Sequence, residues 1–406
     1  MRSVGASTRE PLQLMSSPTL VIADYPVGYA SGFGETLFNL FSGFPDEKLW
    51  SAHPGHLLAA AEKRRGHSVN LPSPRRPRAL PNRLALTYYP FLKAHQSWAT
   101  KRSVQRLRRV VEQHSIRNLL VIPVTPWILS AAISLHKECP KLNFVLFVMD
   151  DWQGHHESHR LPYSRRRREL LRQAVNRANT RFAVSREMAS HYEEVYQNSW
   201  QVAHNAIRSN SIAIPNGEPS RRNQVLLAGD INQFRFDAVL AFAEAIERHN
   251  LRNKRAIEFV VLGEVAEQHR APLSRLDAVT LEDRQPHSIC LEAMRAADLL
   301  YLPLAFSTSS ARISRYSMPT KLPEYLATGK PVLFHAPFES ALFQVAERYD
   351  LNPRLATIDP AALDGFIERW QTEPECIADR FSKASAALAR EFDIDTLASS
   401  FQAAFN

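Results

Sequence analysis

The sequence predicts an α/β protein made of two tandem, doubly wound domains. Short apolar segments alternate with longer segments of helical periodicity, a pattern typical of parallel sheets covered by helices. The chain has 406 residues, which is more than one hydrophobic core usually supports. A segment rich in Pro, Asn, Gly and Ser, IPNGEPSRRN at 214–223, separates two such series and is expected to be a linker.

The first series is expected to form a domain over 1–215, in which 1–18 are a disordered lead-in without the apolar core of a secretory signal. The apolar run at 119–135 approaches the length of a membrane span. Pro123 and Pro126 interrupt it, which favours a buried strand followed by a helix. The expected strands lie at 19–23, 84–88, 118–124, 143–149 and 180–184, and the expected helices at 34–42, 98–114, 164–177 and 186–196.

The second series is expected to form a domain over 216–390. Open parallel sheets bind ligands beyond the carboxyl ends of their strands, so functional residues are expected in the turns that follow the strands. The expected strands lie at 224–229, 257–263, 279–282, 298–304 and 331–335, and the expected helices at 235–249, 288–296, 320–328, 338–348 and 360–371.

Charge divides the chain into two unlike halves. Residues 1–215 hold 29 Lys and Arg against 15 Asp and Glu, a net charge of +14, and the remainder holds 21 against 26, a net charge of −5. The three cysteines, Cys139, Cys290 and Cys376, are far apart and lack a CxxC or histidine pairing. This argues against a disulfide framework or a zinc site and indicates a reducing compartment, by default the cytoplasm.

Basic residues of the first half gather at 62–78, 101–109 and 163–177. An anionic inner membrane leaflet suits such segments, because each basic residue near it contributes about 1 kcal/mol. Nucleic acid is one alternative, although no motif for reading bases accompanies the charges. An ordinary solvated surface is the other. We expect a peripheral position on the inner face of the cell membrane and no nucleic-acid partner.

The segment SMPTKLPEYLATGKPVLFH, at 317–335, begins as a loop, becomes a helix and ends as a buried strand. Lys321 lies at the helix start, where unpaired amides and the positive dipole end disfavour a cation unless an anion joins it. A bound phosphate would explain this lysine. Glu324, one turn on, could then accept hydrogen bonds from a sugar hydroxyl pair; the alternative is a solvated surface ion pair.

Two turns of the first half also attract interest. Gly28, Gly32 and Gly34 follow the first strand, where glycines let backbone approach a ligand closely or simply form a tight turn. The strand FVM at 147–149 runs into two adjacent acids and two histidines. These residues could orient a hydroxyl, support a developing positive charge or exchange a proton, or an acid could cap a turn. The four candidates for catalysis are Asp150, Asp151, His155 and His156.

The segment PTKLPEYLATGKPVL resembles the donor-site helix of retaining glycosyltransferases of family 4, which have the two-domain GT-B fold. Three further segments, at 226–246, 296–304 and 182–207, are similar to other parts of that family in the same order, and VGYASGFGETLFNL at 27–40 is similar to its glycine-rich first turn. The resemblance implies two Rossmann-like domains facing a cleft, with the acceptor on the first domain and the donor on the second. It also implies that the final helix, at 391–406, packs back on the first domain.

Carried over to this chain, the resemblance implies that Arg235 and Lys321 bind a nucleotide diphosphate and that Glu324 holds the ribose hydroxyls. Arg312 and Arg315 either contribute to the same site or are solvated. Thr320, Gly28, Gly32 and Gly34 complete the donor and acceptor loops. Two positions depart from the family pattern: Tyr316 stands where many relatives carry a glutamate, and Asp230 stands where an arginine is common.

The sequence therefore predicts a nucleotide-sugar-dependent glycosyltransferase that acts on a lipid-linked or polysaccharide acceptor in cell-surface glycan synthesis, with retention of configuration. No cofactor or metal is expected, because basic residues would neutralise the leaving diphosphate. Three alternatives stay open. They are a binding protein of the same fold with a decayed donor site, a basic nucleic-acid-binding protein, and another enzyme of the same fold such as a sugar epimerase or phosphorylase.

Overall fold

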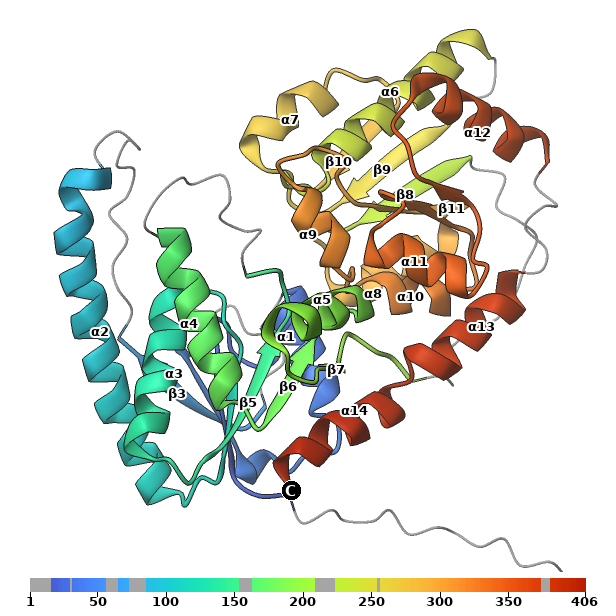
Figure 1. Ribbon diagram of the computed structural model, residues 1–406. Coiled ribbons are helices and arrows are strands. Elements are labelled where there is room, and N and C mark those ends of the chain that lie inside the picture. The colour runs from blue at the N-terminus through green and yellow to red at the C-terminus, as the bar shows by residue number, and fades with distance from the viewer. Residues whose placement is uncertain are drawn as a thin grey trace, which may run out of the picture.

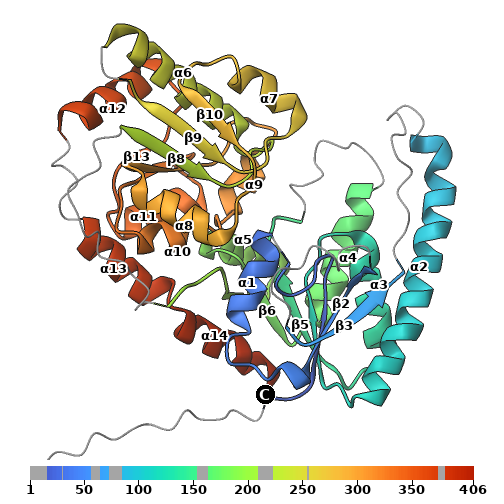
Figure 2. The ribbon, with the colours of Figure 1, turned by 180° about the vertical axis from the view of Figure 1, so that it is seen from behind.

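The computed structural model describes residues 16–29, 31–55, 65–72, 85–152, 163–208, 223–253, 256–373 and 380–406. Two parallel sheets occupy the two halves of the chain, and helices cover the faces of each (Figure 1). The view from behind shows the same two bodies joined along one side, with the C-terminal helices running from one to the other (Figure 2). The predicted α/β fold of two doubly wound domains is confirmed.

The first sheet has seven strands in the order β3-β2-β1-β4-β5-β6-β7, all parallel. Chain order reverses beside β1, which places a crevice at the carboxyl ends of β1 and its neighbours. The strands are β1 Thr19–Ile22, β2 Leu49–Pro54, β3 His67–Leu71, β4 Asn118–Val121, β5 Asn143–Val148, β6 Thr180–Ala183 and β7 Gln201–Val202. The helices are α1 Gly32–Leu40, α2 Ala85–Gln113, α3 Pro126–Glu138, α4 Tyr163–Arg177 and α5 Arg186–Tyr196, with a short 3₁₀ turn at Asp46–Lys48.

The second sheet has six parallel strands in the order β10-β9-β8-β11-β12-β13. Its order reverses beside β8, so a second crevice opens at the end of that strand. The strands are β8 Gln224–Ala228, β9 Glu258–Leu262, β10 Val279–Glu282, β11 Leu299–Pro303, β12 Val332–His335 and β13 Arg354–Leu355. The helices are α6 Phe236–Arg252, α7 Glu267–Leu273, α8 His287–Ala296, α9 Ala311–Tyr316, α10 Leu322–Ala327, α11 Ala341–Arg348 and α12 Pro360–Thr372.

One predicted strand is wrong. The segment at 84–88 was expected to be a strand, but α2 begins at Ala85 and continues for 29 residues. Its pair of tyrosines suggests strand propensity in a short window. The residues that follow are rich in Ala, Leu, Lys, Gln and Arg, and helix growth is cooperative, so the long helix prevails over the local preference.

Four strands are not among those expected: β2, β3 and the two-residue strands β7 and β13. All six residues of β2 are buried, yet they include Ser51 and His53, which interrupt the apolar run that marks a buried strand. Both polar groups are paired inside the domain. The backbone N–H of Val27 donates to Ser51 Oγ at 3.3 Å, and His53 Nε2 lies 2.7 Å from Ser68 Oγ on β3. Burial of these groups is therefore tolerated.

The C-terminal segment runs from the second domain to the first (Figure 1). It contains α13 Arg380–Glu391, α14 Ile394–Gln402 and a 3₁₀ turn at Ala403–Phe405. Phe401 and Phe405 pack on Phe41 with ring centroids 5.6 and 5.7 Å apart, and Asn118 Nδ2 donates to the carbonyl of Phe405 at 2.7 Å. The end of the chain is thus part of the first domain's core.

The apolar run that approaches the length of a membrane span forms β4 and α3, as its two prolines predict. Among the described residues, no helix combines the length and apolarity needed to cross a bilayer.

Candidate active site

A cavity of about 820 Å³ lies between the two domains, at the carboxyl ends of both sheets. It brings together segments from 25 to 36, from 228 to 235 and from 317 to 324. Seven of the predicted site residues line it, namely Gly28, Gly32, Asp150, Arg235, Thr320, Lys321 and Glu324. Residues from opposite ends of the chain therefore face one cleft, where open α/β sheets bind their ligands.

The first-domain wall is shaped by the glycine turn. Gly28 has φ of +80°, a conformation that glycine adopts without strain. Ser31 caps α1 by accepting a hydrogen bond from the N–H of Gly34. A Cβ on Gly34 would lie 2.3 Å from the carbonyl oxygen of Tyr29. Gly34 thus permits the tight turn and does not line the cleft, whereas Gly28 and Gly32 do.

The two adjacent acids after β5 have different surroundings. Asp150 lines the cleft. The side chain of Asp151 is fully buried, accepts a hydrogen bond from the Tyr192 hydroxyl at 3.0 Å and pairs with Arg312 Nε at 2.9 Å. Asp151 and Arg312 therefore tie the domains together and do not line the cleft. His155 and His156 lie outside the described residues.

The donor wall is built on α10. Lys321 stands at the N-cap position of this helix, and its Nζ lies 2.7 Å from Glu324 Oε2. The side chain of Glu324 is almost fully buried. The hydroxyl of Tyr325, on the same helix, accepts a hydrogen bond from the N–H of Ala228 at 2.7 Å, which fixes α10 against the end of β8. A cation and an acid are thus held side by side at a helix start that faces the cavity.

Arg235 approaches the same cavity from the start of α6. Its Nη1 donates to the carbonyl of Asp230 at 3.3 Å and lies 2.9 Å from the position of a Cβ on Gly229. A side chain on Gly229, whose φ is +150°, would therefore displace the guanidinium. Burial lowers the pKa of Arg235, an effect that Tyr325 and Asp230 partly offset, and the group remains cationic at neutral pH.

Sequence reasoning missed a third cation on this wall, Arg284 in the loop after β10. It forms a forked pair with Asp230, from Nε to Oδ1 at 3.0 Å and from Nη2 to Oδ2 at 2.5 Å. Asp230 also accepts the N–H of Glu264 at 3.0 Å. The hydrogen bonds that Arg284 donates to the Asp230 carboxylate raise the pKa of Arg284. The departure at Asp230 was visible in the sequence, but its partner lies 54 residues away and carries no local signal.

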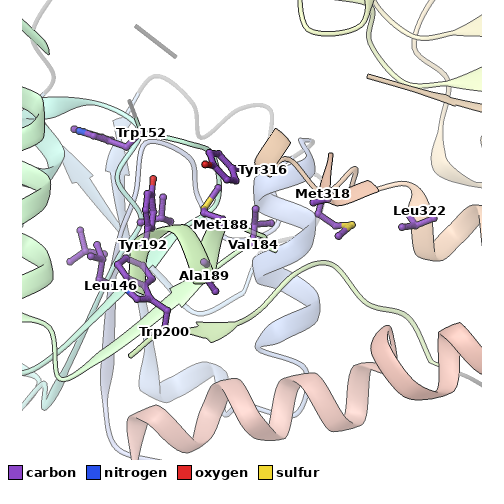
Figure 3. Close-up of a cluster of buried hydrophobic side chains, with 14 of the residues drawn as sticks. Leu146, Trp152, Val184, Met188, Ala189, Tyr192, Trp200, Tyr316, Met318 and Leu322 are labelled. Carbon is purple, nitrogen blue, oxygen red and sulfur yellow. The ribbon is translucent and has the colours of Figure 1, made fainter. Parts of the chain in front are cut away.

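Tyr316 and Arg315 belong to the seam between the domains. Tyr316 stacks on His191 of α5 with ring centroids 5.1 Å apart and lies beside Met188 (Figure 3). Met318 belongs to the same buried apolar cluster, which draws on both domains. Arg315 is exposed and lies over the Tyr316 ring. Neither residue lines the cleft, and Tyr316 serves the contact between the domains.

No group of three or more His, Cys, Asp or Glu suited to a metal ion occurs within the described ranges. The basic side chains that line the cavity in these ranges are Arg235, Arg284, Lys321 and His287. The site therefore offers fixed positive side chains on its second-domain wall, opposite the glycines and Asp150 of the first domain.

Comparisons with known proteins agree with this geometry. Residues 56–210 match the family model described as Glycosyltransferase Family 4. No curated protein matches the chain. Solved structures match over nearly the whole length at low identity, which shows the shared fold. Sucrose-phosphate synthase from Thermosynechococcus elongatus has 11% identity and a TM-score of 0.67, with 95% of this chain and 97% of that chain covered.

Two further structures are similar. HepE from Anabaena, solved in complex with UDP-glucose, has 14% identity and a TM-score of 0.67, with 94% of this chain and 97% of that chain covered. WaaG, a glycosyltransferase involved in lipopolysaccharide biosynthesis, has 14% identity and a TM-score of 0.61, with 96% and 99% covered. The predicted resemblance is confirmed: residues 56–210 match the family 4 glycosyltransferase model, and the chain shares the two-domain GT-B fold of these structures over nearly its whole length.

Proposed function

We propose that this glycosyltransferase moves a sugar from a nucleotide diphosphate donor to a lipid-linked or polysaccharide acceptor, with retention of configuration, in cell-surface glycan synthesis. One observation carries the proposal. Arg235 and Lys321 reach the same cavity from two helix starts, with Glu324 beside the lysine, and face Asp150 and the glycine turn of the other domain. Two cations on one wall suit a diphosphate, and the opposite wall leaves room for an acceptor.

The catalytic contribution of the cations is electrostatic. As the bond between sugar and diphosphate breaks, negative charge grows on the leaving phosphate, and the fixed cations on the cleft wall stabilise it. Arg235 offers a planar fork of donors, whereas Lys321 offers a point charge. Because these residues neutralise the leaving group, the proposed reaction needs no metal ion. Asp150 is proposed to orient the acceptor hydroxyl or to support positive charge at the sugar centre.

The pairing of Lys321 with Glu324 gives the donor site two states. In the structure the two side chains neutralise each other at 2.7 Å. A diphosphate would take over the lysine, because a charge-assisted contact to phosphate replaces the one to the carboxylate. Glu324 would then accept hydrogen bonds from the two ribose hydroxyls. The acid thus holds the lysine in place before the donor arrives and binds the nucleoside afterwards.

We propose that the protein acts at an anionic membrane surface on the cytoplasmic side. Arg102, Arg106 and Arg109 of α2 are exposed and recur at the spacing that places them on one helix face. The similarity to WaaG, a glycosyltransferase involved in lipopolysaccharide biosynthesis, favours a lipid-linked acceptor. Attraction of the basic first domain to anionic lipid would bring such an acceptor to the cleft.

Turnover of labelled nucleotide sugars tests the proposal. The parent protein is incubated with UDP-, GDP-, CDP-, ADP- and dTDP-linked hexoses and a membrane extract, and transfer to lipid or polymer is measured. We expect transfer from one donor class and a loss of at least a hundredfold in Lys321→Ala and Glu324→Ala, in line with removal of a transition-state contact. Variants that turn over as fast as the parent would refute the site. NMR of the product reports its anomeric configuration and separates transfer from epimerisation.

A further inference from the structure

The peptide that precedes the donor lysine is held by the opposite domain. Thr320 comes directly before Lys321, at the entrance to α10. Its carbonyl accepts a hydrogen bond from Asn205 Nδ2 at 2.7 Å, and its side chain abuts Gly32. Both contacts cross from the first domain to the second. The position of Lys321 therefore depends on residues that are far from it in the sequence.

Asn205 is buried, and both the nitrogen and the oxygen of its side-chain amide form hydrogen bonds. Only 3% of the residue is exposed. While its nitrogen donates to Thr320, its Oδ1 accepts a hydrogen bond from Asn39 Nδ2 at 2.9 Å, and Asn39 also donates to the carbonyl of Ala206 at 3.1 Å. Asn39 lies on α1, the helix that follows the glycine turn. Hydrogen bonds through the side chains of Asn39 and Asn205 thus connect α1, on the acceptor side, to the backbone of Thr320 in the donor site.

Gly32 sets how closely the two walls approach. A Cβ at this position would lie 2.8 Å from both Cγ2 and Oγ1 of Thr320. Side chains essentially never approach this closely, so any larger residue would push Thr320 or the domain that carries it. Because Gly32 is the first residue of α1, its lack of a side chain lets the start of that helix pack directly against the donor segment.

We infer that Asn205 and Gly32 are positioning residues, which act through Thr320 to place Lys321 for a diphosphate. The inference rests on the proposed function of Lys321. A hydrogen bond fixes the Thr320 carbonyl, and close packing fixes its side chain, so the following residue has little freedom at the helix start. Loss of either contact should weaken diphosphate binding only to the extent that Lys321 contributes to it.

A double-mutant cycle tests this dependence. Asn205→Leu keeps the size of the side chain and adds no charge, but it removes both hydrogen bonds. Dissociation constants are measured for UDP, GDP, CDP, ADP and dTDP with the parent, and the tightest of these is the probe. We expect Asn205→Leu to weaken the probe about tenfold in the parent and less than about twofold in Lys321→Ala. Equal losses in both backgrounds would overturn the inference, since a merely structural role would be additive.

If Asn205→Leu does not fold, a second variant tests the same inference. Gly32→Ala should weaken the probe about tenfold, and Thr320→Ala in the same chain should restore binding to within about twofold of Thr320→Ala alone, because it removes both clashing atoms. Gly365→Ala is the matched control, since a Cβ there meets nothing within 4 Å. Failure of the second substitution to restore binding would contradict the inference. If Lys321→Ala binds as well as the parent, the proposed function itself fails.

Discussion

Asp151 and Arg312 form a salt bridge between the two domains in which the carboxylate is fully buried and its Oδ2 lies 2.9 Å from the arginine Nε. The Tyr192 hydroxyl donates to the other oxygen of the same carboxylate. This pair stands directly beside Asp150, which lines the cleft. The contact that joins the domains is thus one residue away from a candidate catalytic acid.

Removal of Arg312 should strongly destabilise the protein. Arg312→Ala removes a cation that pairs with the buried Asp151 carboxylate, and loss of one partner of a buried pair costs about 3–5 kcal/mol. Chemical unfolding measures the difference. Arg315→Ala, at an exposed neighbouring position, should change stability by less than about 0.5 kcal/mol. Asp151→Asn combined with Arg312→Ala should recover part of the loss, and no recovery would argue against the buried negative charge of Asp151 as the cause.

Removal of Arg284 should impair ligand binding more than stability. The pair with Asp230 is partly exposed, with 55% and 41% of the side chains accessible, and such pairs contribute less than about 1 kcal/mol. In Arg284→Ala the bare carboxylate of Asp230 faces the cleft, so affinity for a nucleoside diphosphate should fall about fivefold, a cost of about 1 kcal/mol. Asp230→Asn in the same chain should restore affinity. Titration calorimetry measures the affinity of each protein for the nucleoside diphosphate. An unchanged affinity in Arg284→Ala would contradict the prediction.

Stability should fall as the pH drops below neutrality, and His335 should account for part of the fall. Burial lowers the pKa of His335 to about 4 from an ordinary value of 6.5. Between these values the unfolded chain binds the proton and the folded protein does not, so stability rises with pH. The full shift corresponds to about 3 kcal/mol.

Urea unfolding at pH 7.5 and 5.0 checks this prediction. The ring of His335 lies 2.7 Å from the Tyr301 hydroxyl and 2.8 Å from the carbonyl of Thr357. His335→Gln offers polar groups without a titrating ring. We expect the variant to be less stable than the parent at pH 7.5 and to lose less stability at pH 5.0. Parallel losses in the two proteins would show that His335 is not responsible.

Binding to anionic vesicles should depend on α2. Loss of Arg102, Arg106 and Arg109 together should cost about 3 kcal/mol, roughly a hundredfold in the partition constant. Sedimentation with vesicles of phosphatidylglycerol and phosphatidylcholine measures it. The matched control removes three exposed arginines of the second domain, Arg270, Arg275 and Arg295. Equal vesicle binding by the two triple variants would contradict a membrane role for α2. Vesicle binding that does not weaken as the salt concentration rises would contradict an electrostatic cause.

Much of the fold could be predicted because apolar runs mark strands that are buried on both faces. QVLLAG became β8 followed by Gly229 for this reason. The strand β2 escaped because Ser51 and His53 are polar in sequence and paired only in three dimensions. The segment at 84–88 was misjudged because a five-residue window does not contain the helix that continues to Gln113.

The sequence predicted only some of the side chains that line the candidate site. The lysine at a helix start suggested either a bound anion or a solvated ion pair with Glu324, and in the structure Lys321 lines the cavity and pairs with Glu324. Asp150 and Asp151 were equivalent in the sequence, yet in the structure Asp150 lines the cleft and the Asp151 carboxylate is buried against Arg312. Contacts such as Asn205 with Thr320 join segments 115 residues apart, and no local pattern signals them.

Thermal unfolding with nucleoside diphosphates tests the central claim most directly. The parent and Lys321→Ala are melted with UDP, GDP, CDP, ADP and dTDP. A ligand present at a hundredfold its dissociation constant adds about 2.7 kcal/mol of stability, which raises the melting temperature measurably. We predict a rise with at least one diphosphate in the parent and a much smaller rise in Lys321→Ala. No rise with any of the five, or an equal rise in both proteins, would contradict a diphosphate site at Lys321.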